Sequence, residues 1–278
     1  MIFSKTAGVV ISEMKMLRAN GQSGAFALVE GPDDLRFWKM HLKVPRECIV
    51  VADGVINLRG CMQALPVDLL GSVVAIADKD YENFLNPSPF ASCVDTFFYD
   101  EGFLETFIIN TVALRKILRL HADDVRLERF LASHPGVTIY SHLRRIAAVF
   151  GRLRVLNSRM GLGACFSKTF TPYRYVCSRS WILDEPRLLT DFSTAVGWTA
   201  QQLQSAMQAL PKGSSVQLSH GHDIIKILVI GLKAPIGSAS VGEDSISKEL
   251  AIAFEGAALK HKRLYQNLNL WAGARRLI

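Results

Sequence analysis

The sequence predicts an α/β protein with a mainly parallel sheet flanked by helices. Apolar runs at residues 25–29, 48–52 and 73–77 carry no polar break, as strands buried on both faces do. The stretches between these runs have helical patterns and short connections, which favours parallel βαβ units. With 278 residues and 49% hydrophobic content, the chain can bury a substantial core.

The predicted elements follow in chain order. Residues 1–20 predict a short helix with Ser12 as its candidate N-cap. The strand at 25–29 leads through a Gly-Pro turn into an amphipathic helix. A strand at 48–52, a helix at 57–65, the strand at 73–77, a loop at 86–89, a strand at 94–99 and a helix at 102–117 come next.

Three regions are expected. Residues 1–118 form the α/β core, residues 119–212 a basic and mainly helical insertion, and residues 213–278 return to the core and end in a helix over 246–270. Thr199 predicts an N-cap within the insertion. The apolar run after Asp223 is expected to pack on the sheet. The basic cluster at 260–263 is expected to form a solvated face, with a second nucleic-acid contact as the alternative.

Acidic residues follow two of the predicted strands. Glu30 ends the first strand, and Asp78 and Asp80 flank Lys79 at the end of the run 73–77. A period of two would point both aspartates the same way, and such close like charges are usually neutralised by a cation. An exposed loop explains the DxD equally well. Asp33 and Asp34 also suit the N-terminus of the following helix, but that role leaves Glu30 unexplained.

These stretches resemble a known domain. LVEGPDDLRFW followed by VVAIADKDYE looks like the Toprim domain of topoisomerases, bacterial primases and OLD-type nucleases. More narrowly, VEGPDD, VVADGVINLR, DKDYE, FFYDEGFLETFI and HGHDIIKIL resemble the DUF4435 family, a Toprim/OLD-like group that includes the nuclease effector of the PARIS anti-phage system. The resemblance implies a metal-dependent nuclease in antiviral defence, regulated by an ABC-type ATPase partner.

The resemblance also implies the site residues. Glu30, Asp34, Asp78 and Asp80 match the acidic positions of the Toprim pattern, and Glu105 fits a later one for which Glu101 competes. Their hard oxygen ligands suit Mg²⁺ or Mn²⁺, and two such ions would serve phosphodiester hydrolysis. Glu30 could instead act as a general base. Where OLD-type enzymes carry a late lysine, this chain offers His222, with Lys226 one helical turn on, to stabilise the transition state or leaving group.

A basic segment predicts nucleic-acid contact. Residues 129–183 contain no aspartate or glutamate, and aromatic residues interleave with the later basic ones, which suits phosphate contacts and base stacking. A helical insertion with aromatic core residues and solvated arginines is the alternative. The candidate nucleic-acid-binding residues are Arg144, Arg145, Arg152, Arg154, Arg159, Lys168, Arg174 and Arg179.

Overall composition bounds the partners and the compartment. A net charge of +7 favours a polyanionic partner, which could be DNA or RNA, tRNA included. Five scattered cysteines without a CxxC predict a reducing compartment. The sequence shows no signal-peptide pattern and no apolar run of ~20 residues, so a cytoplasmic protein without membrane contact is expected. A homodimer would suit cleavage of two strands.

Three other function classes stay open at this level. A non-catalytic Toprim-fold regulatory or interaction subunit would keep the shape without the activity. A DxD glycosyltransferase would use the aspartates for Mn²⁺ and a sugar nucleotide but has no need of Glu30. A primase-like polymerase would incorporate nucleotides on a single-stranded template.

Overall fold

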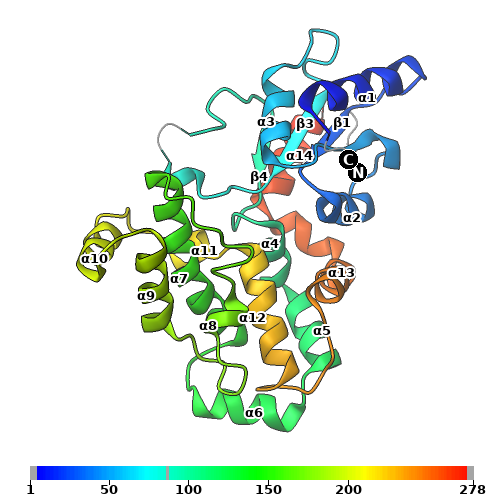
Figure 1. The fold of residues 1–278 in the computed structure, drawn as a ribbon. Helices are drawn as coiled ribbons and strands as arrows, with labels where there is room; N and C mark the ends of the chain where they lie inside the picture. The colour runs from blue at the N-terminus through cyan, green and yellow to red at the C-terminus, as the bar shows by residue number, and fades with distance from the viewer. Residues whose placement is uncertain (1–4, 86–87, 274–278) are drawn as a thin grey trace. The chain divides into compact units, whose positions relative to one another are not determined.

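The computed structural model describes residues 5–85 and 88–273, which form two compact units (Figure 1). Among the described residues, unit 1 comprises 5–85, 88–104 and 254–273, and unit 2 comprises 105–253. The sequence placed the corresponding borders at 119 and 213. In the structure unit 2 begins earlier and ends later, because helices on both sides of the predicted insertion pack with each other and with a helix of the insertion.

Unit 1 is built on a parallel sheet, as the sequence predicted. Among the described residues the strands are β1 (Phe26–Val29), β2 (Ile49–Val51), β3 (Val73–Ala77) and β4 (Thr96–Phe98), in the order β2-β1-β3-β4. All three strand pairings are parallel. Every residue of β1 and β3 is buried, which explains why their sequences lack the polar alternation of a half-exposed strand.

Helices complete unit 1. They are α1 (Ala7–Ala19), α2 (Pro32–His41), α3 (Val55–Gln63) and α14 (Arg263–Ala272), with 3-10 turns at Arg46–Cys48, Glu82–Phe84 and Gly256–His261. Val10 and Met14 of α1 and Leu58 of α3 share one core with alternate residues of the strands, such as Phe26 and Leu28. α2 packs on β2, and α14 packs along β4.

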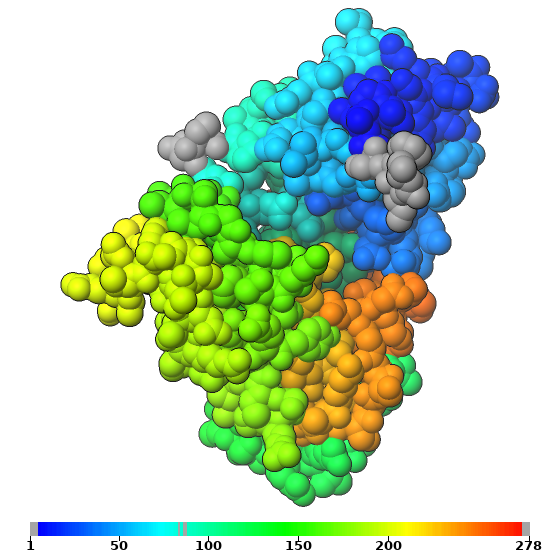
Figure 2. Space-filling model, in the orientation of Figure 1, coloured from blue at the N-terminus to red at the C-terminus, as the bar shows by residue number. Residues whose placement is uncertain are grey.

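Unit 2 is helical. Its elements are α5 (Val112–His121), α6 (Asp124–Ser133), α7 (Ile139–Met160), α8 (Pro172–Tyr175), α9 (Glu185–Ala195), α10 (Ala200–Gln208), α11 (Ser215–Leu218), α12 (Gly221–Lys233) and α13 (Glu243–Ala253). α4 (Leu104–Ile109) begins at the last residue of the first segment of unit 1. In Figure 2, α10, in yellow, forms the outer margin of unit 2.

A buried tryptophan organises the centre of unit 2. Trp181 is fully buried, and its Nε1 donates to the Ile227 carbonyl of α12 at 2.8 Å. Gly231 makes this contact possible, because a Cβ there would lie 2.2 Å from the Trp181 ring. α12 therefore packs on α7, α8 and α13 inside unit 2, which corrects the expectation that it covers the sheet.

Several predicted helices have different limits. The helix expected over 102–117 is divided because Thr111 adopts extended backbone and caps α5 by accepting from the Ala113 N–H. The helix expected over 246–270 becomes α13, a 3-10 turn and α14. Thr6, not Ser12, caps α1, whereas Thr199 caps α10 as predicted. The predicted loop at 86–89 lies partly outside the described residues, since 86 and 87 are not described.

No helix in the described part of the chain is both long enough and apolar enough to cross a membrane.

Candidate functional site

The sheet register brings the ends of β1, β3 and β4 to one edge. Val29 is paired with Ile76, and Ala77 with Phe98. Continuing this register by one or two residues places Glu30, Asp78 and Tyr99 at successive positions of the carboxyl edge. Neighbouring strands lie about 4.8 Å apart, so the backbone positions of Glu30 and Asp78 are close although 48 residues separate them in the sequence.

The loops at this edge contain uncommon backbone conformations. Asp53 after β2 has φ 66°, and Asp80 and Tyr81 after β3 have φ 39° and 64°. Left-handed backbone is uncommon for residues other than glycine and concentrates where a structure holds a functional loop. The sequence carried no signal for these conformations at Asp80 and Tyr81.

The DxD segment does not continue the strand. β3 ends at Ala77, so the side-chain alternation used to align Asp78 with Asp80 stops before both residues. The backbone instead turns, with the Lys79 N–H donating to the Gly102 carbonyl at 2.6 Å. Asp78 Oδ1 accepts from the Leu104 N–H at 3.1 Å and so joins the DxD loop to the start of α4.

Asp34 is held in a buried hydrogen-bond chain. Its Oδ2 accepts from the Gly31 N–H at 3.0 Å, and its Oδ1 accepts from the Tyr99 hydroxyl at 2.6 Å. Trp38 Nε1 in turn donates to the Tyr99 oxygen at 2.8 Å. Asp34 therefore caps α2 and anchors Tyr99. This is the structural role that the sequence offered as the alternative to metal binding.

The ionisation of Tyr99 is affected by two of the acidic residues, Asp34 and Asp78. Its pKa lies well above the usual value, first because the phenol is fully buried and then because the charges of Asp34 and Asp78 oppose ionisation. The two carboxylates thus act on the same hydroxyl from α2 and from the DxD loop. Tyr99 is a site residue that sequence reasoning missed, although it directly follows the predicted fourth strand.

Tyr99→Phe tests this chain. Removing the hydroxyl leaves the buried Trp38 Nε1–H without its acceptor and Asp34 without its donor. We expect the free energy of unfolding to fall by about 1–3 kcal/mol, measured by urea denaturation. Tyr265→Phe is a control in the same unit, because the Tyr265 side chain is only half-buried. An equal loss in both variants would contradict the assigned role of the Tyr99 hydroxyl.

Glu101 and Glu105 have different partners. Glu101 forms a 2.7 Å ion pair with Lys262, and both side chains are largely buried. Lys262 is therefore part of the core of unit 1, which corrects its assignment to a solvated basic face. Glu105 lies in unit 2, where its Oε1 is 3.5 Å from Nδ1 of His222. The structure thus brings together two predicted site residues that are 117 positions apart.

His222 and the side chains around it differ in solvent exposure. The His222 side chain is 61% exposed, whereas Glu105 is 11% exposed. The neighbouring His220 is half-buried, and desolvation followed by the Arg154 charge lowers its pKa well below the usual value. Asp223 is completely buried and pairs with Arg154. Of these two imidazoles, the more solvent-accessible one is therefore that of His222.

The basic segment divides into a core part and a surface part. Arg154 binds Asp223 through two 3.0 Å hydrogen bonds and stacks on Phe166, and Arg144 donates to Ser215, so both guanidinium groups have partners inside unit 2. Among the aromatic residues proposed for base stacking, Tyr173 is exposed and the others are buried: Phe166, Phe170, Tyr175 and Trp181. The candidate nucleic-acid-binding residues that are exposed are Arg145, Arg152, Arg159, Lys168, Arg174 and Arg179.

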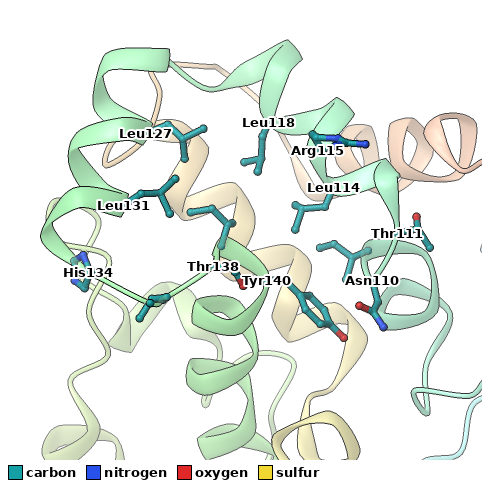
Figure 3. A pocket seen from close by; sticks show the side chains of 14 residues that line it. Asn110, Thr111, Leu114, Arg115, Leu118, Leu127, Leu131, His134, Thr138 and Tyr140 are labelled. Atoms are coloured by element: carbon teal, nitrogen blue, oxygen red, sulfur yellow. The ribbon is translucent and has the colours of Figure 1, made fainter.

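An apolar cavity of unit 2 offers different chemistry. A cavity of about 650 Å³ is lined by Leu114 and Leu118 of α5 and by Leu127 and Leu131 of α6, which face one another in Figure 3. No carboxylate lines it among the described residues. This cavity therefore offers no carboxylate ligand for a metal ion.

Within residues 5–85 and 88–273, no group of three or more His, Cys, Asp or Glu side chains is arranged to hold a metal ion. The donor chemistry nevertheless suits a hard cation, because Glu30, Asp78 and Asp80 supply carboxylate oxygens from adjacent strand ends. Asp34 fits this set least well, since hydrogen bonds already engage both of its oxygens.

Comparison with known proteins leaves the family open. No model of a protein family matches the sequence, and no curated protein matches it.

Proposed function

We propose that this chain is a metal-dependent nuclease of the Toprim type that hydrolyses phosphodiester bonds in DNA or RNA. The observation that carries the proposal is the parallel pairing of β1 with β3, which sets Glu30 beside Asp78 at the carboxyl edge of the sheet. Open α/β sheets bind ligands at this edge. A DxD glycosyltransferase would not need Glu30, so this arrangement favours the nuclease.

The proposed roles follow from the positions of the residues. Glu30, Asp78 and Asp80 would hold Mg²⁺ or Mn²⁺, and a bound ion stabilises charge on the attacking and leaving oxygens of a phosphodiester. The Leu104 N–H fixes the Asp78 carboxylate, and Tyr99 fixes Asp34. This chain would therefore orient its acids through hydrogen bonds before any substrate arrives.

A non-catalytic Toprim-fold subunit is the second candidate. It is favoured by the hydrogen bonds that engage both carboxylate oxygens of Asp34. In either case, control by an ABC-type ATPase in anti-phage defence is part of the proposal, and its support is the sequence resemblance alone.

The decisive experiment is an assay of the purified chain. Total RNA, a tRNA pool, duplex DNA and single-stranded DNA are incubated separately with Mg²⁺, Mn²⁺ or EDTA, with and without a candidate ATPase partner. Metal-dependent discrete fragments support the nuclease. Intact nucleic acid under all of these conditions favours the non-catalytic subunit.

The contact between Glu105 and His222 predicts coupled effects on cleavage. If the carboxylate acts through the imidazole, Glu105→Gln and His222→Gln should each slow cleavage by about a hundredfold, as expected for loss of acid–base assistance. The double variant should then be no slower than His222→Gln. If the double variant is instead slowed by the product of the two single losses, the two residues act independently, as they would if Glu105 were a metal ligand.

A further inference from the structure

A second cavity lies in unit 1, along the edge strand of the sheet. It measures about 670 Å³ and lies between β4 and the start of α14. Its walls include Lys79 of the DxD loop, Phe97 of β4, and His261 and Arg263 before and at the start of α14. This volume falls in the range of small-ligand pockets.

The cavity concentrates positive charge. Lys79, His261 and Arg263 all line it, and none of them forms an ion pair with a carboxylate in residues 5–85 and 88–273. Asp100 is the acidic residue of the lining, and its two oxygens accept from the backbone N–H groups of Arg263 at 2.7 Å and Leu264 at 2.8 Å. Its charge is thus directed at the helix start, which leaves the cationic side chains for an anionic ligand.

The remaining lining suits a base. Phe97 is half-buried, and it alternates with Phe98, which packs on the core on the other side of the sheet. Gln266 and Asn267 add amide groups. Thr96 contributes a buried Oγ1 that has no hydrogen-bond partner among the described residues. An aromatic face, amides and cations together match the parts of a nucleotide.

The cavity is lined by residues that neighbour the acidic edge. Lys79 stands between Asp78 and Asp80 in the chain, and Tyr99, which hydrogen-bonds Asp34, also lines the cavity. All of these residues belong to unit 1. A ligand here would lie next to the proposed cleavage site.

We propose that this cavity binds one unstacked nucleotide of a single-stranded nucleic acid, next to the phosphodiester that is cut. Arg263, His261 and Lys79 contact the phosphate, and Phe97 stacks on the base. A base can enter such a pocket only when it is free of its duplex neighbours, so the substrate is a single strand or a loop. This inference rests on the proposed nuclease function.

Binding without cleavage tests the pocket. The full chain is titrated in EDTA with a fluorescent single-stranded 12-mer, with the same sequence as a duplex, and with adenosine 5′-monophosphate. The variants are Arg263→Gln, Lys79→Gln and Phe97→Leu. Arg46→Gln is the matched control, because Arg46 is exposed, lies in the same unit and does not line the cavity. Circular dichroism confirms that each variant is folded.

We expect each pocket variant to bind the single strand about fivefold or more weakly than wild type, and Arg46→Gln to bind it as wild type does. Losing one phosphate contact should also reduce the slope of log K against log salt by about 0.7 for each cation removed. Adenosine 5′-monophosphate should compete with the 12-mer. Equal binding by Arg263→Gln and Arg46→Gln, or duplex binding as tight as single-strand binding, overturns the pocket.

A parallel cleavage assay separates the two proposals. Weakened binding by the pocket variants, with no cutting by wild type under any condition, would retain a nucleotide pocket and reject the nuclease. Cutting that Arg263→Gln leaves unchanged would retain the nuclease and reject the pocket. Binding of the mononucleotide without binding of the 12-mer would assign the cavity to free nucleotides and overturn the nucleic-acid assignment.

Discussion

Glu30→Gln should abolish metal-dependent cleavage while leaving the fold intact. The change removes one carboxylate charge from the edge shared by β1 and β3 but keeps the size of the side chain. Metal ions supply several kcal/mol of transition-state stabilisation, so loss of a ligand should slow cleavage by about a thousandfold or more. Isothermal calorimetry with Mn²⁺ should show weaker metal binding in the same variant, which gives a readout independent of activity.

Asp33→Asn is the matched control for Glu30→Gln. Asp33 is a nearby acid in the first turn of α2, its side chain is 46% exposed, and it pairs with Arg36 within the helix. Its removal should change neither cleavage nor Mn²⁺ binding. Equal losses in the two variants would indicate a general effect of negative charge. Unchanged cleavage and unchanged Mn²⁺ binding in Glu30→Gln would reject Glu30 as a ligand.

The sheet and its acidic edge were predictable because their signals are local. Each buried strand is a short apolar run, and each site residue on it immediately follows that run. Parallel pairing then brings strand ends together, so the neighbouring positions of Glu30 and Asp78 follow from topology. The α/β class with a parallel sheet was confirmed for this reason.

The partners of the site residues were not predictable because they are distant in sequence. Tyr99 reaches Asp34 across 65 residues, and Lys262 reaches Glu101 across 161. Local patterns show that a residue is polar or apolar, but they do not show which residue it meets. Lys262 could therefore be read as a solvated charge until its ion pair with Glu101 was known.

Periodicity was similarly ambiguous for the helices of unit 2. The apolar run of α12 predicts a buried helix, yet a sheet and a helical bundle can bury the same face. Aromatic residues among arginines suit base stacking or a core with cationic neighbours. Phe166 shows the second outcome, since it is buried and lies 4.6 Å from the Arg154 guanidinium.

Arg154→Met should destabilise the protein more than loss of any exposed arginine. The change leaves the fully buried Asp223 without the two hydrogen bonds and the charge that Arg154 supplies. Asp223 would then have to bind a proton on folding, which at pH 7 costs at most about 4 kcal/mol for a carboxyl with an ordinary pKa near 3.9. We expect the free energy of unfolding to fall by about 3–4 kcal/mol. Arg159→Met, on the exposed end of α7, should cost less than about 0.5 kcal/mol.

The pH dependence of this loss identifies its cause. In the wild-type protein, burial raises the pKa of Asp223 and Arg154 lowers it, with a net rise. Without Arg154 the folded-state pKa rises further, so the folded chain keeps a proton that the unfolded chain releases. Stability of the variant therefore falls as pH increases above about 4, and its deficit relative to wild type should shrink when the pH is lowered from 7 to 5. Urea denaturation across this range measures the deficit. A deficit independent of pH would mean that lost packing against Phe166, rather than the uncompensated carboxylate, destabilises the variant.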